Sequence, residues 1–224
     1  MHEVNSTSAS VEPPSALHRT PIVFVVDDDI SVRESLEPLI RLKGWRPETF
    51  GSAREFLSCP RPFAPSCLVL DVSLPDLDGL ELQQRIASDR TDMPIIFITG
   101  HGDVSMTVRA MKAGAVEFLT KPYGDEVLLG AMQQAIACSY AALRRELALR
   151  AVRDSYASLT GRERQVMASV VRGLLNKQVG VELGISEITV KAHRGKVMRK
   201  MKANSLPDLV NMAARLELAA NPKG

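Results

Sequence analysis

The sequence predicts an α/β domain with a doubly wound, five-stranded parallel sheet, followed by a small all-α helix-turn-helix domain. In the first part, short continuous apolar runs alternate with helical periodicity, five times in about 120 residues. The second part has a short helix, a glycine-containing turn and a long basic helix, which is typical of a helix-turn-helix. Charge divides at the same place, because residues 1–150 carry 15 Lys and Arg against 20 Asp and Glu, whereas residues 151–224 carry 13 against 6.

The bulk composition is that of a soluble globular protein. Of the 224 residues, 45% are apolar and 24% are charged. No apolar stretch approaches the roughly 18 residues of a membrane span, and the N-terminus lacks the apolar core of a secretory signal. The three cysteines have no metal-ligand spacing and fit a reducing compartment. We therefore expect a cytoplasmic protein with no membrane partner.

The apolar runs of the first part are continuous, which is typical of strands buried on both faces of a parallel sheet. Helical spacing of apolar residues fills the segments between them, and Gly44 and Gly114 mark two helix ends. Predicted strands lie at 22–26, 47–50, 67–70, 95–98 and 116–119, and predicted helices at 30–43, 53–57, 77–88 and 103–114.

The chain also divides into predicted segments beyond the sheet. Residues 1–20 are rich in Ser, Thr and Pro and are expected to be a disordered tail. The last helix of the first domain, which spans 21–138, is expected to continue into a helical linker at 139–157. The second domain, at 158–220, opens with the capping-box pair Thr160 and Glu163. Its later helices are predicted at 176–183, 187–201 and 206–218.

Polar residues stand at the carboxyl ends of four predicted strands, where open α/β sheets place their chemistry. Carboxylates that meet there repel one another unless a cation lies among them, and an oxygen-only ligand set suits Mg²⁺. A lysine and a hydroxyl beside such a metal are the components of a phosphoryl-transfer site, in which a carboxylate is the nucleophile. The residues concerned are Asp27, Asp28, Asp71, Thr99 and Lys121.

The long basic helix at 187–201 is a candidate for DNA recognition. With the adjacent Lys202, its basic residues number six against the single acid Glu187, and a preceding partner helix is what a recognition helix requires. Apolar residues, among them Ile188 and Val190, are expected to face the core. The candidates for DNA contact are Thr189, Lys191, His193, Arg194, Lys196 and Lys200.

The motifs of both parts resemble those of a known family. The first part resembles the flavodoxin-like receiver domain of two-component response regulators, and the second resembles the LuxR-type helix-turn-helix, so the chain is similar to the FixJ/NarL class. The receiver motifs are Val26-Asp27-Asp28, Leu70-Asp71, Leu74-Pro75, Asp78-Gly79, Ile98-Thr99-Gly100 and Phe118-Leu119-Thr120-Lys121-Pro122. The LuxR-type motifs include Leu159-Thr160-Gly161-Arg162-Glu163, Leu183-Gly184-Ile185-Ser186 and Thr189-Val190-Lys191-Ala192-His193.

The resemblance implies a role for each matched residue. Asp71 is the implied phospho-acceptor, Thr99 and Lys121 contact the phosphoryl group, and Phe118 is the aromatic switch. Asp27, Asp28, Asp71 and the Ser73 backbone carbonyl are the implied Mg²⁺ site, and the Lys121–Pro122 bond is expected to be cis. The implied partners are a sensor histidine kinase, promoter DNA, RNA polymerase and, after phosphorylation, a second copy of the chain.

Two other functions compete with that of a phosphorylation-switched transcription factor, which is not an enzyme. A Mg²⁺-dependent phosphohydrolase leaves the basic helix unexplained, and Ser73 stands where a neighbouring carboxylate would act as acid or base. A constitutive DNA-binding protein with a vestigial first domain leaves the complete acceptor set unexplained.

The sequence departs from the family at Gly195, where some relatives carry a Lys that reads a base. The base specificity of those relatives therefore cannot be assigned to this chain at that position.

Overall fold

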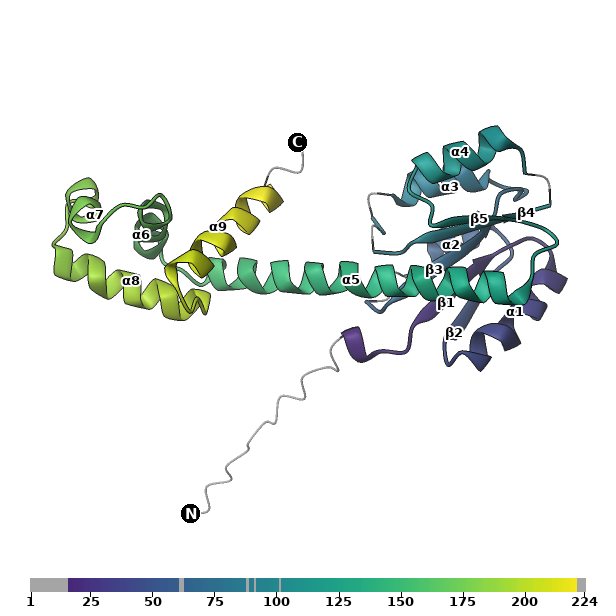
Figure 1. The fold of residues 1–224 in the computed structure, drawn as a ribbon, viewed down its shortest axis with the longest axis horizontal. Coiled ribbons are helices and arrows are strands. Elements are labelled where there is room, and N and C mark those ends of the chain that lie inside the picture. The colour runs from purple at the N-terminus through teal and green to yellow at the C-terminus, as the bar shows by residue number, and fades with distance from the viewer. Residues whose placement is uncertain (1–15, 61–62, 88, 91, 101, 221–224) are drawn as a thin grey trace, which may run out of the picture. The chain divides into compact units, whose positions relative to one another are not determined.

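The computed structural model describes residues 16–60, 63–87, 89–90, 92–100 and 102–220. They belong to two compact units that divide between Arg144 and Arg145. The first unit is built on a five-stranded, all-parallel sheet with the order β2-β1-β3-β4-β5 (Figure 1). Its strands are β1 (Ile22–Val26), β2 (Arg46–Phe50), β3 (Ser66–Asp71), β4 (Ile95–Thr99) and β5 (Glu117–Thr120).

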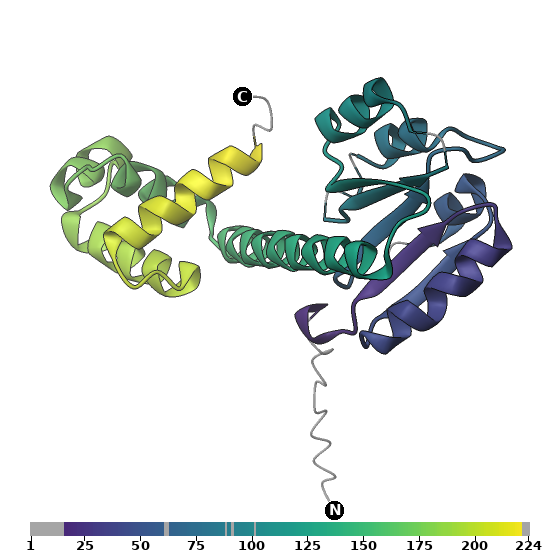
Figure 2. The same cartoon turned by 45° about the vertical axis from the view of Figure 1, so that its right-hand side comes forward.

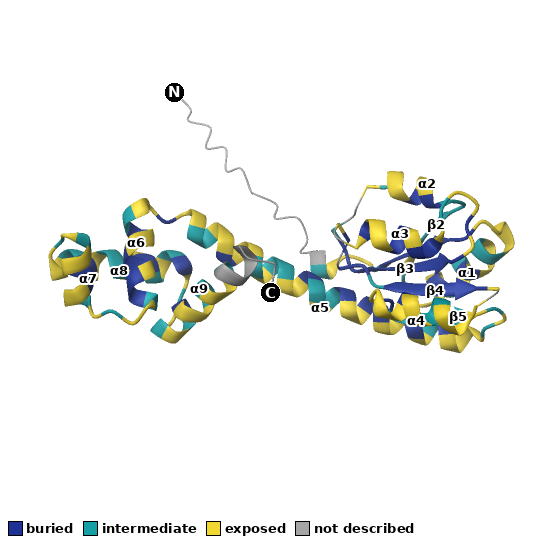
Figure 3. Cartoon of the chain, turned by 90° about the horizontal axis from the view of Figure 1, so that it is seen from above, coloured by how far each residue is buried: buried dark blue, intermediate teal, exposed yellow. Residues whose placement is uncertain are grey.

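Helices cover both faces of this sheet, as the predicted alternation requires (Figure 2). One buried cluster joins strand residues such as Val23 and Val25 to α1 and α5, whereas another joins Phe24 and Val26 to α2, α3 and α4. The central strands are therefore buried on both sides (Figure 3), which explains their continuous apolar sequences. The helices are α1 (Ile30–Leu42), α2 (Ala53–Ser58), α3 (Gly79–Ile86), α4 (Val104–Lys112) and α5 (Asp125–Ala157).

Local sequence determines where these helices begin. Asp29, Ser52, Asp78 and Asp103 each precede a helix, and each side chain accepts a hydrogen bond from a backbone N–H of the first turn. Asp78 places the start of α3 at Gly79, two residues later than the helical periodicity predicted. The caps therefore correct a boundary that hydrophobic spacing set too early.

The structure differs from the prediction at the C-terminal end of the tail and at both ends of the linker. Residues 1–15 lie outside the described residues, whereas Ala16–His18 form a short 3₁₀ helix, so the predicted tail does not extend to residue 20 as an irregular segment. Ser139 is fully buried, and its Oγ accepts a hydrogen bond at 3.0 Å from the Ser66 backbone N–H. Val152 packs into the core of the second unit. The segment free of both cores is therefore shorter than residues 139–157.

In its described part, to residue 220, the second unit consists of the end of α5 and four further helices. The capping box of Thr160 and Glu163 is present at the start of α6, and Ser186 caps α8. Gly184 closes α7 at a φ of +66°, a left-handed conformation that glycine adopts without steric cost. The helices are α6 (Gly161–Val171), α7 (Asn176–Leu183), α8 (Glu187–Met201) and α9 (Leu206–Ala220).

Gly180 has a packing role in the helix-turn-helix. In a helix interior, glycine costs up to about 1 kcal/mol relative to alanine. A Cβ atom at this position would lie 2.8 Å from the backbone oxygen of Ile185, and the Ile185 N–H donates to the Gly180 carbonyl at 2.9 Å. The absent side chain therefore lets the turn between α7 and α8 close tightly against α7.

Candidate functional site

Neighbouring strands deliver polar side chains to one edge of the sheet. Asp27 and Asp28 follow β1, Asp71 ends β3, and Thr99 ends β4. Lys121 follows β5, and its backbone N–H donates to the Thr99 carbonyl oxygen at 2.7 Å. Because β1, β3, β4 and β5 are consecutive in the sheet and parallel, their carboxyl ends meet at the same edge.

Lys121 joins the two carboxylates that lie deepest. Its Nζ lies 2.8 Å from Asp27 Oδ2 and 2.8 Å from Asp71 Oδ2. The second oxygen of Asp71 accepts a hydrogen bond from the Ser73 backbone N–H at 2.9 Å. Asp27 Oδ1 accepts one from the Asp29 backbone N–H, also at 2.9 Å. Each carboxylate is therefore held by donors on both oxygens.

The electrostatics of this cluster follow from burial and from an excess of carboxylates. Burial raises the pKa of Asp27, an effect that exceeds the opposing hydrogen bond from Lys121. Burial also acts to lower the pKa of Lys121, but its hydrogen bonds to Asp27 and Asp71, together with the attraction to both negative charges, outweigh burial and raise that pKa to about 12. Lys121 is accordingly a permanent cation at neutral pH.

The carboxylate cluster fits a hard divalent cation. Asp27, Asp28 and Asp71 each offer a carboxylate oxygen, and these oxygens lie within 4.8 Å of one another. Asp28 is exposed, whereas the other two are buried, so the group opens to solvent on one side. Oxygen ligands with room for water suit Mg²⁺. The structure thus brings together the three side chains predicted as metal ligands.

The remaining residues predicted for this site surround the cluster. Ser73 is exposed and lies next to Asp71 in the loop after β3, whereas Thr99 is fully buried at the end of β4. The half-buried ring of Phe118 lies 6.0 Å from that of Phe97, measured between ring centroids. A Cβ atom at Gly102 would lie 3.0 Å from the Phe118 ring and 3.2 Å from the Thr99 methyl group. Gly102, which sequence reasoning missed, therefore leaves room for this ring beside Thr99.

The peptide bond between Lys121 and Pro122 is cis, as the resemblance implied.

The recognition-helix candidate α8 has one exposed face and one packed face. Val190, Val197 and Met201 are buried in the core of the second unit. The face on the other side is exposed along the helix. It carries Ile188, Lys191, Ala192, Gly195, Lys196 and Arg199, with Glu187 at its edge.

Only two of the six residues predicted to contact DNA lie on that exposed face, namely Lys191 and Lys196. Lys200 instead donates from Nζ to Glu163 Oε2 at 2.7 Å and to the Ser158 carbonyl at 3.1 Å. Lys200 therefore holds α8 to the start of α6, and its DNA contact remains a prediction.

The other three candidates lie on the flanks of α8. Arg194 donates to Asn176 Oδ1 at 3.1 Å, and Thr189 is bonded to Ser186 at the helix cap. His193 is partly buried, with its Nδ1 atom inside the protein. The structure does correct one expectation for α8, because Ile188 was predicted to face the core but is 80% exposed. The sequence predicted the helix at 187–201 correctly, but only the packing of α8 reveals which of its side chains are exposed.

Comparisons with known proteins match both units. Residues 23–133 match the model described as "Response regulator receiver domain", and residues 157–213 match "Bacterial regulatory proteins, luxR family". Nodulation protein W of Bradyrhizobium diazoefficiens is 52% identical over 203 residues, which cover 89% of this chain and 88% of that protein. The chain is a response regulator of the FixJ/NarL class.

Two further similarities support this assignment. The transcriptional regulatory protein FixJ of Bradyrhizobium diazoefficiens is 41% identical over 193 residues, which cover 86% of this chain and 94% of that protein. The solved structure of the response regulator StyR matches with a TM-score of 0.79 and 46% identity, over 88% of this chain and 100% of that one. The predicted fold class is confirmed, and the response regulator has a receiver domain and a LuxR-type DNA-binding domain.

Within the part of the chain that the structure describes, no helix combines the length and apolar character needed to cross a membrane.

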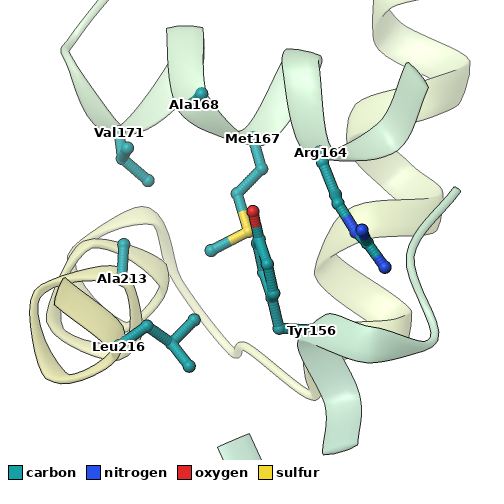
Figure 4. Close-up of a pocket in the computed structure, with 7 residues that line it drawn as sticks. All are labelled: Tyr156, Arg164, Met167, Ala168, Val171, Ala213 and Leu216. Atoms are coloured by element: carbon teal, nitrogen blue, oxygen red, sulfur yellow. The ribbon is translucent and has the colours of Figure 1, made fainter. Parts of the chain in front are cut away.

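The DNA-binding domain of the response regulator contains an apolar pocket of about 270 Å³ (Figure 4). The pocket lies between Tyr156 at the end of α5, helix α6 and helix α9, and it includes none of the predicted DNA contacts. Its lining residues are Tyr156, Arg164, Met167, Ala168, Val171, Ala213 and Leu216.

Proposed function

We propose that Asp71 accepts a phosphoryl group from a phosphohistidine of a sensor kinase, and that this modification controls binding of the second domain to promoter DNA. The observation that carries the proposal is the position of Lys121 Nζ, which bonds directly to Asp71 Oδ2 and Asp27 Oδ2. A permanent cation beside a carboxylate at the open edge of the sheet favours an incoming phosphate.

The chemical step transfers one phosphoryl group. A carboxylate oxygen of Asp71 attacks the phosphorus atom, a P–O bond forms, the P–N bond breaks, and the electron pair remains on the imidazole nitrogen of the kinase. Lys121 neutralises negative charge on the transferred group, and the Thr99 hydroxyl donates a hydrogen bond to it. Mg²⁺, held by Asp27, Asp28, Asp71 and the Ser73 carbonyl, supplies further positive charge when bound.

Transmission of the signal is proposed to run through β4, α4 and β5. When Lys121 and Thr99 engage the phosphoryl group, the half-buried ring of Phe118 changes its position beside Thr99, where the absence of a side chain at Gly102 leaves it room. Helix α4 presents a row of exposed apolar side chains at helical spacing, and these give a second copy of the chain a surface on which to pack. The row consists of Val104, Val108 and Met111, which are 82%, 44% and 43% exposed.

The output domain is proposed to bind DNA through the exposed face of α8. Lys191, Lys196 and Arg199 lie on this face, and their charges suit the phosphates of a duplex. A dimer places two such helices on two half-sites, which raises affinity over that of one domain. The bound protein then acts on RNA polymerase at the promoter.

The first experiment to test this function is phosphorylation by a small acyl phosphate in the presence of Mg²⁺. We expect the intact mass to increase by one phosphoryl group and the sedimentation coefficient to rise toward that of a dimer. The variant Asp71→Asn should do neither, whereas Ser31→Ala, an exposed change in the first turn of α1, should behave as wild type. Equal mass gain in Asp71→Asn would assign the acceptor elsewhere, and repeated turnover of a phosphate ester would identify a phosphohydrolase.

A further inference from the structure

Ile188 occupies an unusual position for an apolar side chain. It is the second residue of α8 and is 80% exposed, whereas Val190 and Val197 of the same helix are buried. At about 100° per residue, Ile188 and Val197 lie on opposite sides of the helix. Ile188 is therefore directed away from the core of the domain and is not part of that core.

The surroundings of Ile188 indicate what it contacts. Ala192 and Gly195 continue its face at spacings of four and seven residues, and a Cβ atom at Gly195 would meet nothing within 4 Å. Small side chains on this line allow the helix axis to approach a surface closely. Ile188 then extends farther than its neighbours on the line, at the end of the helix that enters the major groove in helix-turn-helix proteins.

Positive charge borders this apolar line. Lys191, Lys196 and Arg199 lie beside it on the exposed face, and Glu187 forms an ion pair with Lys191 at 3.1 Å. A purely apolar partner would offer these basic side chains no negative charge, whereas a duplex places phosphates around an apolar contact on the groove floor. In the major groove, the 5-methyl group of thymine is the apolar feature of the base edges.

We infer that Ile188 is a specificity-determining residue that packs against the thymine 5-methyl group in each DNA half-site. This inference rests on the proposed binding of DNA through α8 and adds the base feature that α8 recognises. The expected contribution is about four-fold in affinity per half-site, the equivalent of burying one methyl group.

Uracil substitution tests the inference, because deoxyuridine removes only the methyl group. Full-length protein treated with acyl phosphate and Mg²⁺ is used to select a duplex from a randomised pool. Each thymine of that duplex is then replaced by deoxyuridine, and Kd is measured at fixed salt. For wild type, we expect one thymine per half-site at which uracil weakens binding about four-fold.

Variants assign that loss to Ile188. Ile188→Ala should bind the thymine and uracil duplexes equally, and Ile188→Val should keep most of the discrimination. Lys196→Ala is the matched control on the same face, and it should weaken binding to both duplexes while the four-fold ratio remains. Circular dichroism verifies that each variant is folded.

Two results overturn the inference and differ in what they imply. If wild type selects a duplex but no uracil position weakens it, or if Ile188→Ala retains the full ratio, then Ile188 does not contact a thymine methyl group and DNA binding itself stands. If phosphorylated wild type selects no duplex at all, the proposed function fails together with the inference.

Discussion

Replacement of Gly79 by alanine tests whether the loop after β3 holds Asp71 in place. A Cβ atom at Gly79 would lie 2.6 Å from the backbone oxygen of Asp71 and 2.9 Å from the Val72 Cα atom. Ordinary contacts begin at 3.4 Å, so one of the two backbones must move by about 0.8 Å. Overpacking of this kind costs about 1–3 kcal/mol in the free energy of unfolding.

The only tryptophan, Trp45, packs against the core beneath α1 and α5, so its fluorescence reports unfolding of the receiver domain. We expect the urea midpoint of Gly79→Ala to fall by about 1 M. Displacement of Asp71 should also slow phosphorylation by acyl phosphate, by up to about 100-fold.

Gly130→Ala is the matched control for this substitution. Gly130 lies within α5, where a Cβ atom would meet nothing within 4 Å. The substitution should stabilise the domain by about 0.5–1 kcal/mol and leave the phosphorylation rate unchanged. Equal urea midpoints and equal rates for Gly79→Ala and wild type would refute the close contact between this loop and Asp71.

Three further outcomes follow from other contacts. Gly180→Ala should destabilise the DNA-binding domain by about 1–2 kcal/mol in chemical denaturation, because the added methyl group meets the backbone of the turn; an unchanged midpoint would contradict this. The hydrogen bond from Lys200 is the main cause that lowers the pKa of Glu163 from 4.5 to about 2. Its stabilisation should be complete above about pH 4.5 and lost as pH falls toward 2, and hydrogen exchange in α6 should show this loss for wild type but not for Glu163→Gln. Burial raises the pKa of the Cys67 thiol to about 12, so it should resist alkylation at pH 8 while the exposed Cys138 reacts.

Much of the fold was predictable because burial on both faces leaves a simple mark on the sequence. The strands β1, β3 and β4 are continuous apolar runs, and all three lie where those runs predicted them. Edge strands leave a weaker mark. The edge strand β2 has the mostly polar sequence Arg-Pro-Glu-Thr-Phe, because it is only partly buried. The first residues of the helices depended on capping residues such as Asp78, and the spacing of apolar residues does not show where a cap lies.

The receiver site was easier to predict than the DNA-binding face. The carboxyl ends of parallel strands lie at one edge of the sheet, so Asp27, Asp71 and Lys121 could be placed together there from the strand ends alone. That prediction does not require knowing which face of a helix is exposed. The exposed face of α8 depends instead on how the helix packs against α6 and α7. Its basic composition could not reveal that Lys200 pairs with Glu163 or that Ile188 is exposed.

The central claim is that phosphorylation of Asp71 controls DNA binding by the second domain. The most direct measurement is the Kd of full-length wild type and of Asp71→Asn for one selected duplex, at fixed salt, with and without acyl phosphate and Mg²⁺. We predict that acyl phosphate tightens binding by wild type at least ten-fold and leaves Asp71→Asn unchanged. Equal affinity of both proteins under both conditions would contradict the claim and identify a constitutive DNA-binding protein.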